Sequence, residues 1–270
     1  MPLPALTLVF WRVALGAVAV AIGLVLTGRR ASLRPPPRAV LALGLLLAVH
    51  WAFYFASIRA TSIASANLVT YANPILVALL APALIGETVP RVSVLALLAS
   101  VAGILVIGVW GPTSGTGAVK AGGLVLATLA AVSYAGLILG LKRWAGGVDP
   151  GSIALWHCTL AAVVLSPAAF TSAYGALDVR EVLYVVLLGV VLTGASDLVF
   201  LTALRSVPAT SAGILAYMEP VSAALLAVAL LGEQLTWAVI LGGGLIVAGG
   251  AALVVASRDA PTPALNPWTI

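Results

Sequence analysis

The sequence predicts an all-α polytopic membrane protein, and three observations support this prediction. Hydrophobic residues make up 62% of the 270 residues and charged residues only 8%, with a mean hydropathy of +1.18. A soluble domain carries about 25% charged residues, so this composition indicates lipid as the solvent. Apolar stretches of about 20 residues, long enough to cross the hydrocarbon core, follow one another along the chain. Two of these stretches are near copies, which predicts an internal repeat.

Nine spans are predicted from the apolar stretches and from the glycine, proline and charged residues that separate them. They cover residues 5–27, 39–58, 62–85, 91–110, 117–141, 151–171, 182–204, 208–231 and 236–256. Polar connections such as GRRASLRPPPR and KRWAGGVDPG join them, and a polar, proline-rich tail follows at 257–270.

Basic residues are distributed unequally between the two sides of these spans, which predicts the orientation. Nine fall on one side: Arg29, Arg30, Arg34, Arg38, Arg91, Lys142, Arg143, Arg205 and Arg258. Three fall on the other side: Arg59, Lys120 and Arg180. The richer side is expected to be cytoplasmic, which places the C-terminus in the cytoplasm and residue 1 outside.

The repeat has a constant offset of 146 residues. YANPILVALLAPALIGE, at 71–87, matches YMEPVSAALLAVALLGE, at 217–233, and the offset holds through the intervening loops. The span at 117–141 then has no partner, because that partner would precede residue 1. We therefore expect two five-helix units of opposite orientation, an inverted repeat. The first comprises residues 1–112 and lacks its first helix, and the second comprises 113–256. A truncated start and a true nine-helix fold both remain open.

Pro74 and Pro220 lie at equivalent positions near the middle of two spans. Each lacks an N–H and crowds the carbonyl four residues earlier, so both helices are expected to break there. Polar residues cluster around the prolines: Asn67, Tyr71, Asn73, Tyr217 and Glu219. A broken helix with polar neighbours at mid-depth indicates a transporter's binding site. The alternative is a packing kink that binds nothing.

Asp197 and Glu219 are the two acidic residues within predicted spans. A charge at the bilayer centre costs about 2.5–3.5 kcal/mol on insertion scales, so both are expected to face the protein interior. Each is a candidate for coupling transport to protons. The alternative is a protonated side chain that ties helices together.

Four further residues are predicted to line a substrate site. His50 and Tyr54 share a helix face at i and i+4, Tyr134 is central in its span, and Trp156 lies near the cytoplasmic interface. Arg12 is expected to extend toward the outer interface, and its alternative role is to attract a substrate carboxylate. No second metal ligand lies at i+4 from His50, so no metal site is predicted. Glu87 and Glu233 are interpreted as interface residues outside the site.

The sequence also resembles a known family. EPVSAALLAVALLGE at 219–233, Pro74 with Gly86 and Glu87, and FWR at 10–12 are similar to motifs of the drug/metabolite transporter superfamily, in its EamA family. Among these, an aromatic amino acid exporter is the nearest likeness. The resemblance implies ten helices in two inverted halves, so the first helix is missing here. The motifs specify the superfamily well and the substrate poorly.

Together these observations predict a secondary transporter that exports amino acids or related small metabolites through a central mid-membrane cavity by alternating access. An intramembrane enzyme is not expected, because HExxH, GxSxG and paired intramembrane aspartates are absent from the sequence. The alternatives are a non-transport assembly or sensor module and a transporter of drugs or nucleosides. We expect no cofactor, no nucleic acid partner, contact with membrane lipid, and residence in a bacterial inner membrane. A monomer is compatible with the sequence.

Overall fold

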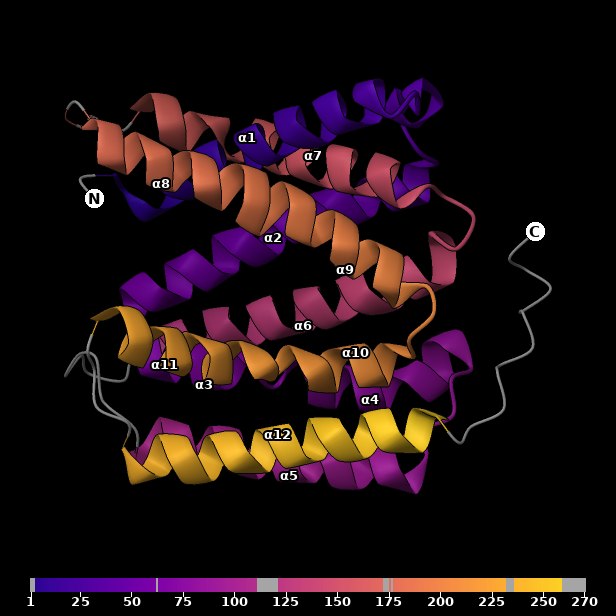
Figure 1. The fold of residues 1–270 in the computed structure, drawn as a ribbon, viewed down its shortest axis with the longest axis vertical. Helices are drawn as coiled ribbons and strands as arrows, with labels where there is room; N and C mark the ends of the chain where they lie inside the picture. The colour runs from indigo at the N-terminus through magenta and orange to yellow at the C-terminus, as the bar shows by residue number, and fades with distance from the viewer. Residues whose placement is uncertain are drawn as a thin grey trace. The chain divides into compact units, whose positions relative to one another are not determined.

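The regular secondary structure of the described residues is entirely helical. The structure is a computed structural model that describes residues 3–61, 63–110, 121–171, 175, 177–231 and 236–258. The elements are α1 (Ala5–Leu26), η1 (Arg30–Leu33), α2 (Arg38–Ala60), α3 (Ile63–Thr70), α4 (Asn73–Ile85), α5 (Arg91–Trp110), α6 (Ala121–Trp144), α7 (Pro150–Thr171), α8 (Val179–Gly189), η2 (Val190–Ala195), α9 (Ser196–Leu204), α10 (Ala209–Ala216), α11 (Met218–Leu231) and α12 (Trp237–Arg258) (Figure 1).

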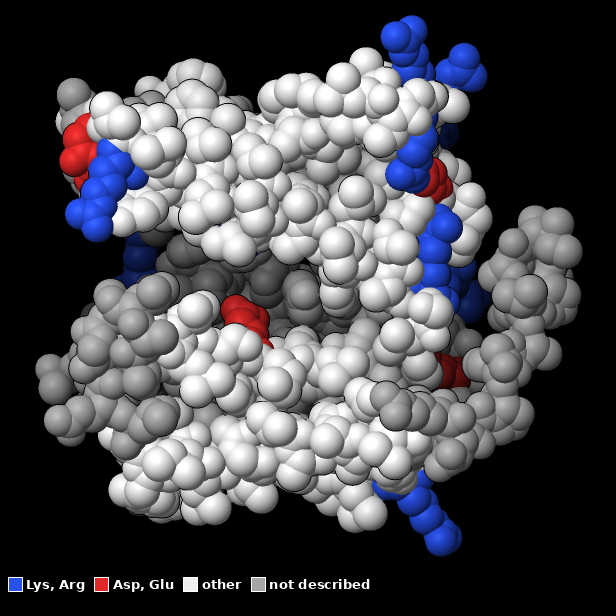
Figure 2. Space-filling view, viewed as in Figure 1, with Lys and Arg blue, Asp and Glu red and all other residues white. Residues whose placement is uncertain are grey.

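The apolar composition predicted membrane-spanning helices, and the structure confirms helices of that kind. Within the described residues, six helical stretches are long and apolar enough to cross a membrane. One of them, Val179–Leu204, runs through the η2 segment, and another, Ser65–Ile85, runs through the break between α3 and α4. The apolar helices Arg91–Ile107 and Trp237–Ala252 are shorter. The sides of the helices visible in Figure 2 are almost uncharged, as a lipid-facing surface requires.

The chain folds as two compact units. Unit 1 comprises Met1–Phe55 with Gly140–Ser206, and unit 2 comprises Ala56–Leu139 with Val207–Ile270. Each unit therefore combines segments from both sides of residue 112. The helix bounds follow the sequence offset of 146, since α1 is followed at that distance by α7, and α5 by α12. The opposite orientation of the two repeats stays a prediction.

In unit 1, α1 packs along α7 and along the η2 segment. Small residues allow this approach, because a Cβ on Gly194 would lie 3.0 Å from the carbonyl oxygen of Gly16. Val9, Val13, Cys158, Ala161 and Leu165 form a buried apolar core there with Ala48.

In unit 2, α5 and α12 lie side by side (Figure 1). The last helix is rich in glycine, and this allows α12 to pack closely on α5. A Cβ on Gly242 would lie 2.6 Å from the carbonyl oxygen of Gly103, and one on Gly249 would lie 2.8 Å from that of Ala96. Substitution at either glycine would therefore force two backbones apart.

Candidate functional site

Two helices of unit 2 are interrupted near the predicted prolines. The first interruption lies at Tyr71 and Ala72, between α3 and α4, and the second lies at Tyr217, between α10 and α11. Pro74 and Pro220 each fall in the first turn of the second half-helix. The first-turn N–H groups of a helix have no intrahelical partner, so proline is tolerated there. The breaks therefore begin just before the prolines rather than at them.

The first break frees two main-chain carbonyls, and side chains satisfy both. The Thr70 oxygen would normally accept from residue 74, but Pro74 has no N–H, and the Asn73 Nδ2 donates to it at 3.0 Å. The Tyr71 oxygen would normally accept from Ile75, whose N–H bonds to Ala72 instead. The Tyr217 hydroxyl donates to the Tyr71 oxygen at 2.6 Å. The two carbonyls that this break frees are therefore paired, as an apolar environment requires.

The second of these bonds joins the two breaks directly. Tyr71 and Tyr217 are partners at the offset of 146, and their ring centroids are 6.3 Å apart. Tyr217 is only 1% exposed and belongs to the core of unit 2. Beside it, a Cβ on Gly213 would lie 3.2 Å from the Pro74 Cβ, so α10 crosses closely over the start of α4. The two helix breaks are thus packed against each other.

Glu87 was interpreted from the sequence as an interface residue outside the site, but in the structure it contacts the start of α10. Its two carboxylate oxygens accept hydrogen bonds from the Ala209 N–H at 2.8 Å and the Thr210 N–H at 3.1 Å. These are the first N–H groups of α10, and the preceding Pro208 makes no side-chain cap. A carboxylate at a helix N-terminus pairs with orphan donors and with the helix dipole. Glu87 therefore anchors the half-helix that ends at Tyr217. The recurrence of Gly-Glu at the offset of 146 residues is the sequence signal that could have pointed to a structural role for Glu87.

Two buried oxygens at the first break remain without a hydrogen-bond partner in the described part of the chain. They are Thr70 Oγ1 and Asn73 Oδ1, and their residues are 8% and 7% exposed. Both can accept a hydrogen bond, so this break has acceptor capacity beyond its own needs. The other predicted residues of unit 2, Asn67, Tyr134 and Glu219, lie on α3, α6 and the first turn of α11. Glu219 is exposed in the structure, whereas it was expected to face the protein interior.

In unit 1, α2 carries a ladder of aromatic side chains. The rings of His50 and Tyr54 stack with centroids 6.2 Å apart, which confirms that they share a helix face. Trp51 stacks on Phe55 at 5.8 Å and meets Tyr54 edge-on. His50 is 7% exposed, so in this conformation it is a packed residue. The predicted convergence of His50 and Tyr54 with Tyr71 and Tyr217 involves residues of both units and stays a prediction.

Arg12 is held within unit 1 by specific contacts. Its Nε donates to Thr193 Oγ1 at 2.6 Å, and its guanidinium lies 4.9 Å from the centroid of the Trp51 ring. The Thr193 hydroxyl donates in turn to the Leu188 carbonyl oxygen at 2.8 Å. Thr193 belongs to η2, a π-helical segment, and such segments are frequent at functional sites. Neither Trp51 nor Thr193 was singled out from the sequence, because nothing local marks them.

Asp197 follows η2 on α9, and the charge of Arg12 acts on it. Its Oδ2 is buried and accepts no hydrogen bond from the described residues. A desolvated carboxylate oxygen without a donor is costly. An acidic side chain within a membrane-spanning stretch is a candidate functional residue.

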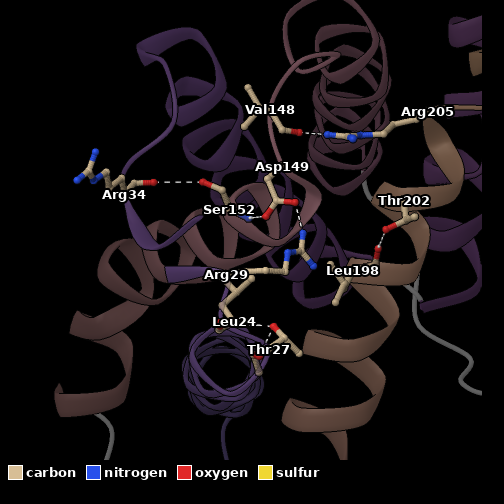
Figure 3. A network of polar contacts seen from close by, with 11 residues as sticks. Leu24, Thr27, Arg29, Arg34, Val148, Asp149, Ser152, Leu198, Thr202 and Arg205 are labelled. Atoms are coloured by element: carbon tan, nitrogen blue, oxygen red, sulfur yellow. Dashed lines mark hydrogen bonds and ion pairs between the residues drawn. The ribbon is translucent and has the colours of Figure 1, made fainter. Parts of the chain in front are cut away.

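A polar network lies where α1 ends, α7 begins and α9 ends (Figure 3). Arg29 forms an ion pair with Asp149, Arg205 donates to the Val148 carbonyl oxygen, and Ser152 donates to that of Arg34 at 3.2 Å. Burial raises the pKa of Asp149, but hydrogen bonds with Ser32, Arg29 and Ser152 and the charge of Arg29 outweigh it, so this pKa lies below 3.8.

Trp156 belongs to the same region. Its indole Nε1 donates to the Arg34 carbonyl oxygen at 3.2 Å, which ties α7 to the connection between α1 and α2. Its predicted contact with substrate stays a prediction. No cluster of three or more His, Cys, Asp or Glu side chains able to hold a metal ion occurs within the described ranges.

Comparison with known proteins places this architecture in a family. The model of the EamA-like transporter family matches residues 2–109 and 121–255. The uncharacterized transporter YxxF of Bacillus subtilis (strain 168) is 29% identical over 187 residues, which are 69% of this chain and 60% of that protein. An uncharacterized transporter of Archaeoglobus fulgidus is 29% identical over 214 residues, 79% of this chain and 75% of that protein. The matched part of the chain thus spans less than two thirds of the Bacillus relative.

A crystal structure with a TM-score of 0.84 and 24% identity covers 97% of this chain and 90% of its own, which shows the same fold. Both the family description and the names of the two relatives denote transporters and not enzymes. Because the family model matches both halves of the sequence over most of their length, this chain belongs to the EamA-like transporter family.

Proposed function

We propose that the protein is a secondary transporter that exports amino acids or related small metabolites by alternating access through a central mid-membrane cavity. The observation that supports this proposal best is the pair of helix breaks in unit 2, joined by the bond from the Tyr217 hydroxyl to the Tyr71 carbonyl oxygen. Discontinuous helices at mid-depth are the usual location of a transporter's substrate site, because half-helices can pivot and their ends present polar groups.

The residues that we assign to the substrate site suit a small amphipathic substrate. Tyrosine and tryptophan rings provide apolar contact with little loss of entropy, and their polar tips orient a ligand. We place His50, Tyr54, Asn67, Tyr71, Asn73, Tyr134, Trp156, Tyr217 and Glu219 at the substrate site. Tyr217 is 1% exposed, so its contact with substrate requires the break to open.

Several finer features belong to the same proposal. We assign the protein to a bacterial inner membrane, with its C-terminus in the cytoplasm and two inverted repeats at 1–112 and 113–256. Glu219 and Asp197 are the proposed coupling residues. The substrate is amino acid-like, and the surrounding partner is membrane lipid.

Flux in proteoliposomes tests the proposal. The full chain is reconstituted and uptake is measured for labelled phenylalanine, leucine, uridine and a lipophilic cation, against liposomes without protein. Saturable, competed flux of the amino acids is the expected result. If only uridine or only the cation is transported, the substrate is a nucleoside or a drug and not an amino acid. If none of the substrates is transported, a sensor or assembly module is favoured.

A further inference from the structure

Basic side chains gather at one end of unit 1, where α1 ends, α7 begins and α9 ends (Figure 2). Asp149 lies at the same end, but its carboxylate is already paired with Arg29. This end therefore carries an excess of positive charge, and in the orientation that we assign it faces the cytoplasm. The basic residues of unit 1 near this end are Arg29, Arg30, Arg34, Arg38, Lys142, Arg143 and Arg205.

The connection between α1 and α2 is held in place by contacts with α7 and with the turn before it. The Ser152 hydroxyl and the Trp156 indole Nε1 both donate to the Arg34 carbonyl oxygen, each at 3.2 Å. The ion pair between Arg29 and Asp149 holds the beginning of the same connection. The first two contacts use the main chain of Arg34 and not its side chain. The connection therefore presents that side chain from a fixed backbone.

Three guanidinium groups of this connection are open to a ligand. Arg30, Arg34 and Arg38 are exposed, and no residue in the described part of the chain pairs with their side chains. Figure 3 shows the Arg34 guanidinium pointing away from Ser152. A guanidinium carries N–H groups in a planar fork that matches two oxygens of a phosphate. Because the backbone is already held, a phosphate ligand loses less entropy on binding to these groups.

Exposed apolar side chains adjoin the arginines. At the end of α1, Ile22, Val25 and Leu26 are 53%, 41% and 81% exposed, and Arg30 begins η1 a few residues later. In a membrane, the exposed apolar side chains of a spanning helix contact acyl chains. The surface thus offers apolar contact with cations beside it, which is the order in which a phospholipid presents its acyl chains and its phosphate. A soluble anion would use only the cations.

We propose that this surface binds anionic phospholipid, with phosphate groups on Arg30, Arg34 and Arg38 and acyl chains along the exposed end of α1. Each basic residue near a membrane surface adds to the attraction of anionic lipid, and these three lie within residues 30–38. They need not share a single phosphate, since neighbouring head groups lie side by side in a leaflet. The inference concerns the lipid, so it holds whichever substrate the protein transports.

Titration of the full chain in detergent, with bound lipid counted by native mass spectrometry, tests the inference. Phosphatidylglycerol is the anionic probe, and phosphatidylcholine has the same phosphate but no net charge. The wild type should bind phosphatidylglycerol more tightly. The combined variant Arg30→Gln, Arg34→Gln, Arg38→Gln should bind it about 10- to 100-fold more weakly and bind phosphatidylcholine much as before. The matched control removes the same charge from exposed positions elsewhere and should keep most of the binding: Arg59→Gln, Arg91→Gln, Arg180→Gln.

The difference between the two combined variants is the decisive result. If both lose phosphatidylglycerol equally, the attraction is diffuse and the site assignment is overturned. It is also overturned if the wild type binds the two lipids equally. If inorganic phosphate displaces phosphatidylglycerol where chloride of equal ionic strength does not, the surface is a site for a soluble anion and the lipid is refuted.

A second variant covers the case in which the glutamine variant does not fold. Replacing Arg30, Arg34 and Arg38 by lysine keeps the charge but removes the planar fork. This variant should bind phosphatidylglycerol more weakly than the wild type and the matched control do. If it binds the lipid as tightly as the wild type, the guanidinium–phosphate contacts are refuted.

Discussion

Deleting a single oxygen atom removes the hydrogen bond that joins the two helix breaks. Tyr217→Phe keeps the ring, which is 1% exposed and packed in the core of unit 2, and deletes the hydroxyl that donates to the Tyr71 carbonyl oxygen at 2.6 Å. The Ile75 N–H, which would bond to this oxygen in a continuous helix, bonds to the Ala72 oxygen instead. The change therefore removes the Tyr217 donor from a main-chain acceptor in a site where water has little access.

The expected magnitude follows from that accounting. An unsatisfied buried acceptor costs about 1–3 kcal/mol. For a chain of this size, a loss of about 2 kcal/mol lowers the melting temperature by about 4–8 °C. Since the ring is retained, no cavity contributes to this loss.

Thermal unfolding of the purified protein in detergent, with reconstituted flux measured in parallel, tests the prediction. Tyr71→Phe is the matched control, because Tyr71 enters the bond through its main chain, which the substitution leaves unchanged. It should lower the melting temperature less than Tyr217→Phe does. If Tyr217→Phe melts within about 1 °C of the wild type, the bond does not hold the breaks together and the reasoning is refuted.

Three further predictions concern charged residues. Glu87→Ala should destabilise the protein by about 2 kcal/mol, because two N–H groups of α10 lose a charged cap, and Glu87→Gln should cost less; equal melting temperatures for both variants and the wild type would contradict this. Glu219→Gln should fold, bind substrate and lose the pH dependence of flux between about pH 6 and pH 8 if Glu219 exchanges protons; an unchanged pH profile would remove that role. Asp149→Asn should cost about 0.5–1 kcal/mol, since the ion pair with Arg29 is partly exposed. The pKa of Asp149 is lowered in the folded protein, so this contribution is present above about pH 3.8 and is lost as the pH falls through the folded value; melting temperatures of variant and wild type should therefore converge in acid.

Sequence reasoning placed the helices well because the signal is local. Within the described residues, six apolar stretches form helices long enough to cross a membrane, and Pro74 and Pro220 lie just after the two interruptions. The interruptions begin a few residues before the prolines, since proline is compatible with the first turn of a helix and the chain starts its second half-helix there. The close packing of the last span was also predictable, because glycine leaves no side chain between two backbones.

Other features depended on residues more than a hundred positions apart. The acceptor for the Tyr217 hydroxyl is 146 residues away, the helix that Glu87 caps begins 122 residues away, and the hydroxyl that holds Arg12 is 181 residues away. Arg12 was expected to reach for the membrane surface, which is the usual behaviour of an arginine on an isolated helix. In the folded chain, Thr193 and Trp51 offer it a hydrogen bond and a ring face inside unit 1.

The sequence by itself determined which segments are helical and where two of them break, because hydrophobicity and proline act along a single segment. Only the tertiary structure decided which partner each buried polar group received. In a membrane interior, water cannot supply that partner, so the choice is made by whichever donor or acceptor the packing of neighbouring helices brings within hydrogen-bonding distance.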